Sequence, residues 1–114
     1  MRVDYRIVEE ITHDGGWDVV GVMALWHSDP PHLRLRGLIS HTVSRRIWAR
    51  IQQRVEDQDL TLETYHQALK GDEQYYRLQP EIHTIERGTA AEIREYLRNK
   101  YVFVTQEPEL APAD

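Results

Sequence analysis

Six arginines with no acidic residue among them are the strongest chemical feature of this sequence. No Asp or Glu lies between Pro30 and Val55, although the whole chain carries a net charge of −5. The six are Arg34, Arg36, Arg45, Arg46, Arg50 and Arg54. Each guanidinium presents a rigid fork of N–H donors that matches the oxygens of a carboxylate or a phosphate. The window therefore predicts a site that binds anionic groups.

Four of these arginines fall on a predicted amphipathic helix that runs from about His41 to Val55. Its apolar residues recur with the period of an α-helix. Arg46, Arg50 and Arg54 are spaced four apart and form a stripe along one border of the apolar face. No acidic residue within this helix lies one turn away to neutralise the stripe.

Three interpretations of the arginine stripe follow. The chain's own acids could pair with it, for example the acidic loop at residues 56–59. The stripe could instead contact an acidic surface on another protein or on a second copy of this chain, as a dimer. The third possibility is contact with nucleic-acid phosphate, which the overall negative charge opposes.

Of these, we expect a non-enzymatic accessory or regulatory protein that acts by protein–protein contact. The charges would steer the encounter, and apolar groups would supply most of the binding energy. A nucleic-acid-binding regulator is the alternative that uses the same arginines. The residues expected to contact the partner are Arg45, Arg46, Trp48, Arg50 and Arg54, with Tyr75 and Tyr76 at the rim.

Two histidines and an aspartate lie on one proline-containing loop. His27 and His32 flank Asp29, and His41 follows nine residues later. Imidazole and carboxylate groups bind divalent metals, so these four residues are candidate ligands in a small His-based, metal-dependent enzyme. Their spacing matches no standard metal motif. We therefore expect ordinary loop histidines and no metal or other cofactor.

Signatures of nucleophilic or phosphate chemistry are absent from the sequence. The chain has no cysteine and no Gly-x-Ser-x-Gly turn around a serine nucleophile. Its glycines do not form a phosphate-binding loop, because no Gly-Lys-Ser or Gly-Lys-Thr follows them. The sequence thus favours a protein that binds over one that catalyses.

The elements that must position these residues follow from the apolar pattern. Residues 2–12 alternate like a strand, and Asp14-Gly15-Gly16 permits a tight hairpin turn. Residues 17–26 are apolar on both faces, which is typical of a covered central strand. A third strand is expected at residues 33–36, with Gly37 as a bulge or its end.

The second half of the chain predicts two further helices and two short strands. Thr61 is a candidate cap for a helix that ends at Gly71, and residues 89–92 form a capping box for another helix. Residues 82–85 suit an edge strand that follows a proline. Residues 101–105 are β-branched and aromatic, so we expect a C-terminal strand there.

Composition fits a folded domain. The chain has 114 residues, of which 40% are hydrophobic and 29% charged. We expect one domain at 1–105 and a flexible acidic tail at 106–114.

No apolar run approaches the roughly 20 residues that span a bilayer, so no membrane contact is expected. The lack of cysteine and of a signal peptide favours the cytoplasm.

The order of elements predicts an α+β fold. We expect a mostly antiparallel sheet of three to five strands, made of the N-terminal hairpin plus the C-terminal strand. About three helices would pack on one face of this sheet. Regular alternation of strands and helices, which a doubly wound parallel sheet requires, is missing.

Overall fold

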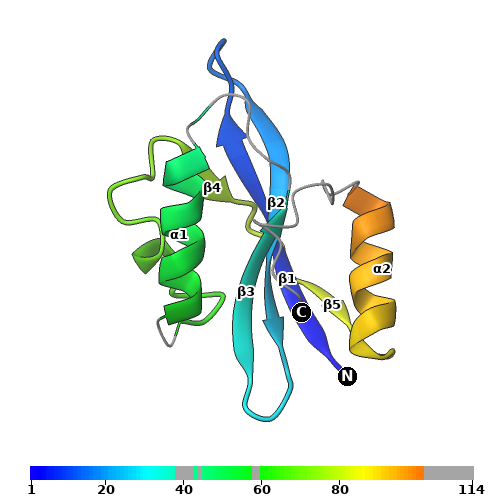
Figure 1. Cartoon of the computed structure of the whole chain (residues 1–114). Helices are drawn as coiled ribbons and strands as arrows, with labels where there is room; N and C mark the ends of the chain where they lie inside the picture. The colour runs from blue at the N-terminus through cyan, green and yellow to red at the C-terminus, as the bar shows by residue number, and fades with distance from the viewer. Residues whose placement is uncertain (38–42, 44, 58–59, 102–114) are drawn as a thin grey trace.

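The computed structural model describes residues 1–37, 43, 45–57 and 60–101 (Figure 1). Within them, the chain forms a five-stranded antiparallel sheet and two α-helices. The strands are β1 (Val3–Ile11), β2 (Trp17–Trp26), β3 (His32–Gly37), β4 (Tyr76–Leu78) and β5 (His83–Ile85). The helices are α1 (Arg45–Asp57) and α2 (Ala90–Tyr101), with a short 3₁₀ turn, η1, at Tyr65–Gln67. The α+β class and the antiparallel sheet are therefore confirmed.

The sheet is built around the N-terminal hairpin. Its strand order is β3-β2-β1-β4, and β5 pairs with the beginning of β1 while β4 pairs with its end. The predicted hairpin turn is confirmed, since the Thr12 N–H donates to the Gly16 carbonyl at 2.8 Å and Gly15 has a φ of +86°. β2 has a strand on each side, as its two apolar faces predicted.

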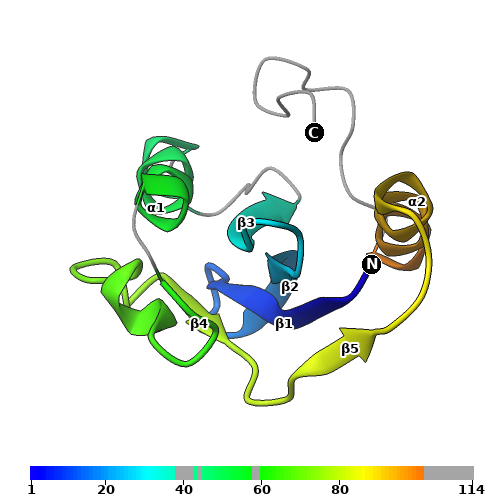
Figure 2. The same ribbon diagram turned by 90° about the horizontal axis from the view of Figure 1, so that it is seen from below.

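The two helices contact opposite faces of the sheet (Figures 1 and 2). Neighbouring residues of a strand point to opposite faces. Val8 packs in the apolar cluster that contains α1, and the adjacent Ile7 packs in the cluster that contains α2. The expectation of about three helices on one face was wrong, because β2 is apolar on both faces and each face needs a cover.

The helix expected between Thr61 and Gly71 is replaced by successive turns. The Thr61 hydroxyl does accept hydrogen bonds from the N–H groups of Glu63 and Thr64, as a cap would. The chain then makes bonds between residues three apart, including η1, in place of an α-helix. The buried Arg6 holds this segment to the sheet, because its guanidinium donates to the carbonyl of Leu62 at 3.0 Å.

The C-terminal part of the described chain follows the sequence prediction more closely. The capping box is confirmed: the Thr89 N–H donates to Glu92 at 2.9 Å, and the Glu92 N–H donates to the Thr89 hydroxyl at 3.2 Å. β5 lies within the predicted edge strand, whereas β4 was not predicted. Tyr101, expected to begin a strand, is the last residue of α2. Residues 102–105 and the tail at 106–114 lie outside the described residues.

Neither described α-helix has the length and apolar character needed to cross a membrane.

β2 and β3 approach each other closely at Gly21 and Gly37, which pair in the register. A Cβ on Gly37 would lie 2.1 Å from the carbonyl oxygen of Val20. A Cβ on Gly21 would lie 2.4 Å from the carbonyl oxygen of Arg36 and 3.1 Å from the Trp48 ring. Glycine at these positions therefore lets β3 pair closely with β2 and lets Trp48 of α1 pack over Gly21.

Candidate functional site

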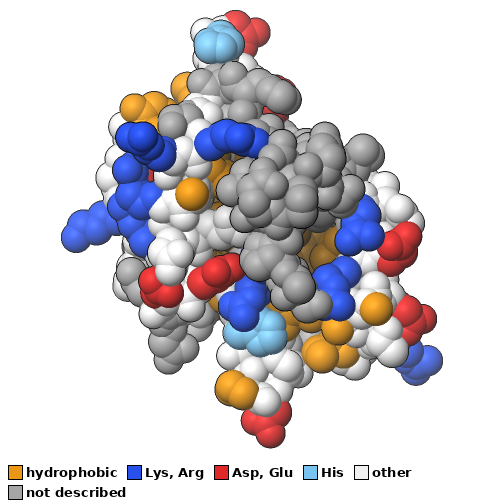
Figure 3. All heavy atoms as spheres, viewed as in Figure 1, with side chains coloured by type: hydrophobic (Ala, Val, Ile, Leu, Met, Phe, Trp, Pro, Cys, Tyr) orange, Lys and Arg blue, Asp and Glu red, His pale blue; other side chains and the backbone are white. Residues whose placement is uncertain are grey.

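Three of the four arginines of α1 lie on the exposed side of the helix, and Arg54 is half-buried at its border. Trp48, Ile51 and Val55 are buried against the strands, as the helical period predicted. Arg45, Arg46 and Arg50 are exposed. Figure 3 shows Lys and Arg side chains gathered over the upper part of α1 and Asp and Glu side chains near its lower end. We call the exposed side of this helix, from Arg45 to Asp57, the α1 surface.

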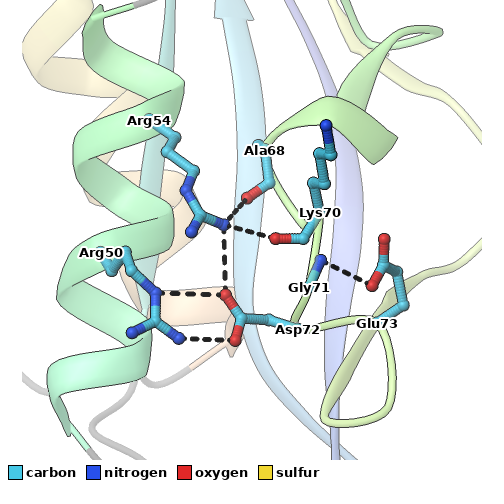
Figure 4. Close-up of polar contacts among 7 residues, drawn as sticks. All are labelled: Arg50, Arg54, Ala68, Lys70, Gly71, Asp72 and Glu73. Carbon is cyan, nitrogen blue, oxygen red and sulfur yellow. Dashed lines mark hydrogen bonds and ion pairs between the residues drawn. The ribbon is translucent and has the colours of Figure 1, made fainter.

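Two stripe arginines bind one buried aspartate, an arrangement that we call the Asp72 clamp (Figure 4). Arg50 donates to Asp72 through Nη2 at 2.6 Å and through Nε at 3.4 Å. Arg54 donates to the same carboxylate at 3.2 Å and also to the carbonyls of Ala68 and Lys70 at 3.1 and 2.9 Å. The clamp joins α1 to the turns that precede β4.

The charges in the clamp do not balance. The side chain of Asp72 is 4% exposed, whereas those of Arg50 and Arg54 are 50% and 28% exposed. Two guanidinium groups therefore share one carboxylate, and half of the Arg50 side chain still faces solvent. Internal pairing, the first of the three interpretations, thus holds for Arg50 and Arg54.

The acid that pairs with Arg50 and Arg54 lies outside the acidic loop. Glu56, from the acidic loop, binds Arg36 of β3 at 3.1 Å. Arg50 and Arg54 pair with Asp72, which is 22 residues from Arg50 and was not singled out in the sequence. The signal available in the sequence was weak, because it was only that Asp72 directly follows a glycine, a residue typical of turns. In the structure this glycine, Gly71, has a φ of +89°.

Two aromatic residues expected at the contact surface lie in the core. Trp48 is 7% exposed and Tyr76 is 1% exposed, with their ring centres 5.5 Å apart. The Tyr76 hydroxyl donates to the buried carboxylate of Glu10 at 2.9 Å. Tyr75 is half-buried against the same apolar cluster. We therefore leave Trp48 and Tyr76 out of the surface considered below.

The loop histidines hydrogen-bond to different partners. His27 Nε2 lies 2.7 Å from a carboxylate oxygen of Asp4, and His32 Nδ1 lies 2.9 Å from the Ser28 hydroxyl. Asp29 is exposed, and His41 lies outside the described residues. Within the described part of the chain, no three His, Asp or Glu side chains come together in a way that could hold a metal ion.

Asp4 is the centre of a polar cluster at the end of the sheet. Its carboxylate accepts hydrogen bonds from Thr84 at 2.6 Å and from His27, and Arg2 lies 3.2 Å away. Because an ionised carboxylate only accepts, His27 Nε2 carries the proton in this contact. Burial raises the pKa of Asp4, but the bonds from Thr84 and His27 and the charge of Arg2 outweigh burial and lower it.

The lowered pKa of Asp4 predicts a loss of stability in acid. An acid whose pKa is lower in the folded state stabilises the fold above its unfolded value, and this stabilisation is lost as pH falls through the folded value. We expect the unfolding free energy of the wild type to fall more steeply below about pH 4 than that of Asp4→Asn. Urea titrations from about pH 6 to pH 3 measure this difference. The exposed Asp29→Asn is the control, and a slope for Asp4→Asn equal to that of the wild type would contradict the prediction.

The sequence matches no protein-family model and no curated protein, and the fold matches no solved structure. Function must therefore be inferred from this chain's own residues. We take the α1 surface forward, because it combines clustered arginines with exposure and is tied by the Asp72 clamp to the turns before β4.

Proposed function

We propose that this chain is a non-enzymatic accessory or regulatory protein of the cytoplasm that acts by protein–protein contact through the α1 surface. The observation that carries the proposal is the concentration of exposed arginine on one helix. The first turn of α1 contains no acid, and its exposed residues include Arg45, Arg46 and Arg50. Such a surface attracts acidic groups on a partner.

The Asp72 clamp supports this function by fixing the helix. It ties Arg50 and Arg54 to a buried carboxylate, and through Arg54 to two backbone carbonyls. A rigid helix loses little conformational freedom when it binds, so less of the interaction energy is spent on ordering. The half of Arg50 that stays exposed can still contact a partner.

The composition of the α1 surface also sets the character of the contact. Its exposed residues are charged, amidic or small, and Trp48 is buried beneath them. Exposed charge pairs each contribute little affinity, but they speed association and set orientation. We therefore expect a reversible association that weakens as salt is added, which suits a regulatory role.

Charge reversal at the start of α1 tests the proposal. Arg45→Glu with Arg46→Glu avoids the Asp72 clamp, whereas Arg50→Glu would place an acid against Asp72. The matched control is Arg87→Glu with Arg98→Glu, which makes the same change of charge in and before α2. Each protein is immobilised, exposed to extract of its native host, and the retained proteins are identified by mass spectrometry.

We expect the wild type and the α2 control to retain the same partner and the α1 variant to lose it, by about tenfold or more. Circular dichroism must show all three proteins folded. Retention by the α1 variant would contradict the proposal. The extract is also treated with nuclease, and loss of the partner after that treatment would point to nucleic acid and likewise overturn protein contact.

A further inference from the structure

The order of charges along α1 is the reverse of what an isolated helix favours. Arg45 and Arg46 lie at its N-terminus, where the helix dipole is positive, and Glu56 and Asp57 lie at its C-terminus, where it is negative. Each of these charges faces the like end of the dipole, and of the terminal charges only Arg54 in the last turn is favourably placed. A local arrangement that opposes the stability of its own element often serves a contact.

Four of the exposed residues of α1 form one line along the helix. Arg46, Ala49, Gln53 and Asp57 are spaced three or four apart and are all exposed. Arg46 and Asp57 are about 16 Å apart along the axis. The middle of the line is occupied by a small residue and a neutral amide, and Gln53 donates to Asp57 at 2.8 Å. The line is therefore basic at one end and acidic at the other, and the exposed Arg50, which is bound to Asp72, lies beside its uncharged middle.

We propose that α1 docks antiparallel against α1 of a second copy of this chain, so that Arg46 of each copy meets Asp57 of the other. This inference rests on the proposed function and names its partner. A two-fold axis near the middle of the helix brings the two pairs together at once and sets Ala49 and Gln53 in the centre. The dipoles of the two helices then run in opposite directions, so each arginine end lies beside the negative end of the other helix.

The same line of charges disfavours the other arrangements. Parallel helices would place Arg46 against Arg46 and Asp57 against Asp57. A uniformly acidic partner that covered the whole line would meet Glu56 and Asp57 with like charge. Only a surface that is acidic at one end and basic at the other matches along its full length, and an antiparallel α1 has this pattern.

Complementary charge reversal tests the arrangement. The two single variants are Arg46→Glu and Asp57→Arg, and the control is Glu63→Arg, an exposed acid outside α1. In each single variant, every Arg46–Asp57 contact of the homodimer becomes a contact between like charges. In an equal mixture of the two variants, one copy of each restores opposite charges at both contacts. The probe is the purified chain alone, and sedimentation velocity measures its mass at about 0.02 M and about 0.5 M salt.

We expect the wild type and the control to self-associate at low salt and to dissociate at high salt. Each single variant should associate at least about tenfold more weakly, and the mixture should recover association. Both substitutions place charges as the helix dipole favours, so neither should lower the midpoint of thermal unfolding. A structural role for these residues would lower that midpoint.

Two outcomes would overturn the antiparallel dimer. One is a wild type that stays monomeric at low salt up to the highest soluble concentration. The other is a mixture that associates no better than its separate components. If either occurs while the partner from extract still depends on Arg45 and Arg46, the dimer fails and the proposed function stands. If the extract experiment fails as well, both are wrong.

Discussion

Gly37→Ala is expected to destabilise the protein by about 3 kcal/mol, at the upper end of the cost of overpacking. The added Cβ would lie 2.1 Å from the Val20 carbonyl oxygen and 2.4 Å from the Gly21 Cα. Both atoms belong to the backbone of the central strand, so no side-chain rotation can relieve the contact. β3 would have to move away from β2, and the packing of Trp48 over Gly21 would loosen with it. Urea unfolding followed by circular dichroism measures the loss.

Gly16→Ala is the matched control for this prediction. Its Cβ would lie 3.1 Å from the Thr12 hydroxyl, at the end of a side chain that can rotate. We expect this variant to lose less than about 1 kcal/mol. Equal losses in the two variants would show that the close approach of β2 and β3 is not what requires glycine at position 37.

Asp72→Asn is expected to cost about 2 kcal/mol, although the side chain keeps its size. An amide has one acceptor oxygen, so it can serve one of the two arginines, and its NH₂ group would face the other. The loss stays below the roughly 3–5 kcal/mol of a fully buried pair, because Arg50 and Arg54 keep part of their contact with water. The measurement is the urea midpoint at neutral pH, with an unchanged slope.

Glu73→Gln provides the comparison for the clamp. Glu73 is exposed and accepts one hydrogen bond from the Gly71 N–H at 2.8 Å, which glutamine can also accept. Its substitution should change stability by less than about 0.5 kcal/mol. If Asp72→Asn were equally mild, the clamp would contribute no stability to the connection between α1 and the turns before β4.

Local patterns predicted much of the fold. Alternation and the Asp14-Gly15-Gly16 turn predicted the hairpin, and the reciprocal bonds of Thr89 and Glu92 are those of the predicted capping box. The segment after Thr61 shows where such reasoning fails. Its cap is present, but its carbonyls accept hydrogen bonds from Arg6 and Arg54. These donors come from distant parts of the chain, and a local pattern does not include them.

The site was less predictable than the fold for the same reason. The arginines were visible as a charge cluster, but Asp72, the partner of Arg50 and Arg54, comes from a turn 18 to 22 residues away. The burial of Trp48 followed from its position on the apolar side of the helix, so its assignment to the contact surface was inconsistent with that position. The Asp4–His27 bond joins β1 to the residue after β2, 23 residues away, and had no sequence signal.

The placement of the two helices on opposite faces implies that they can leave the sheet separately. α2 is anchored by Ile93 and Leu97, its two described buried residues, which pack in one apolar cluster. α1 contributes Trp48, Ile51 and Val55 to the other and is also held by the Asp72 clamp. Elements with fewer buried contacts open at lower free energy and exchange their amide hydrogens earlier. α2 is therefore the piece that detaches first, and the protein can lose it for short periods while the proposed contact helix stays in place.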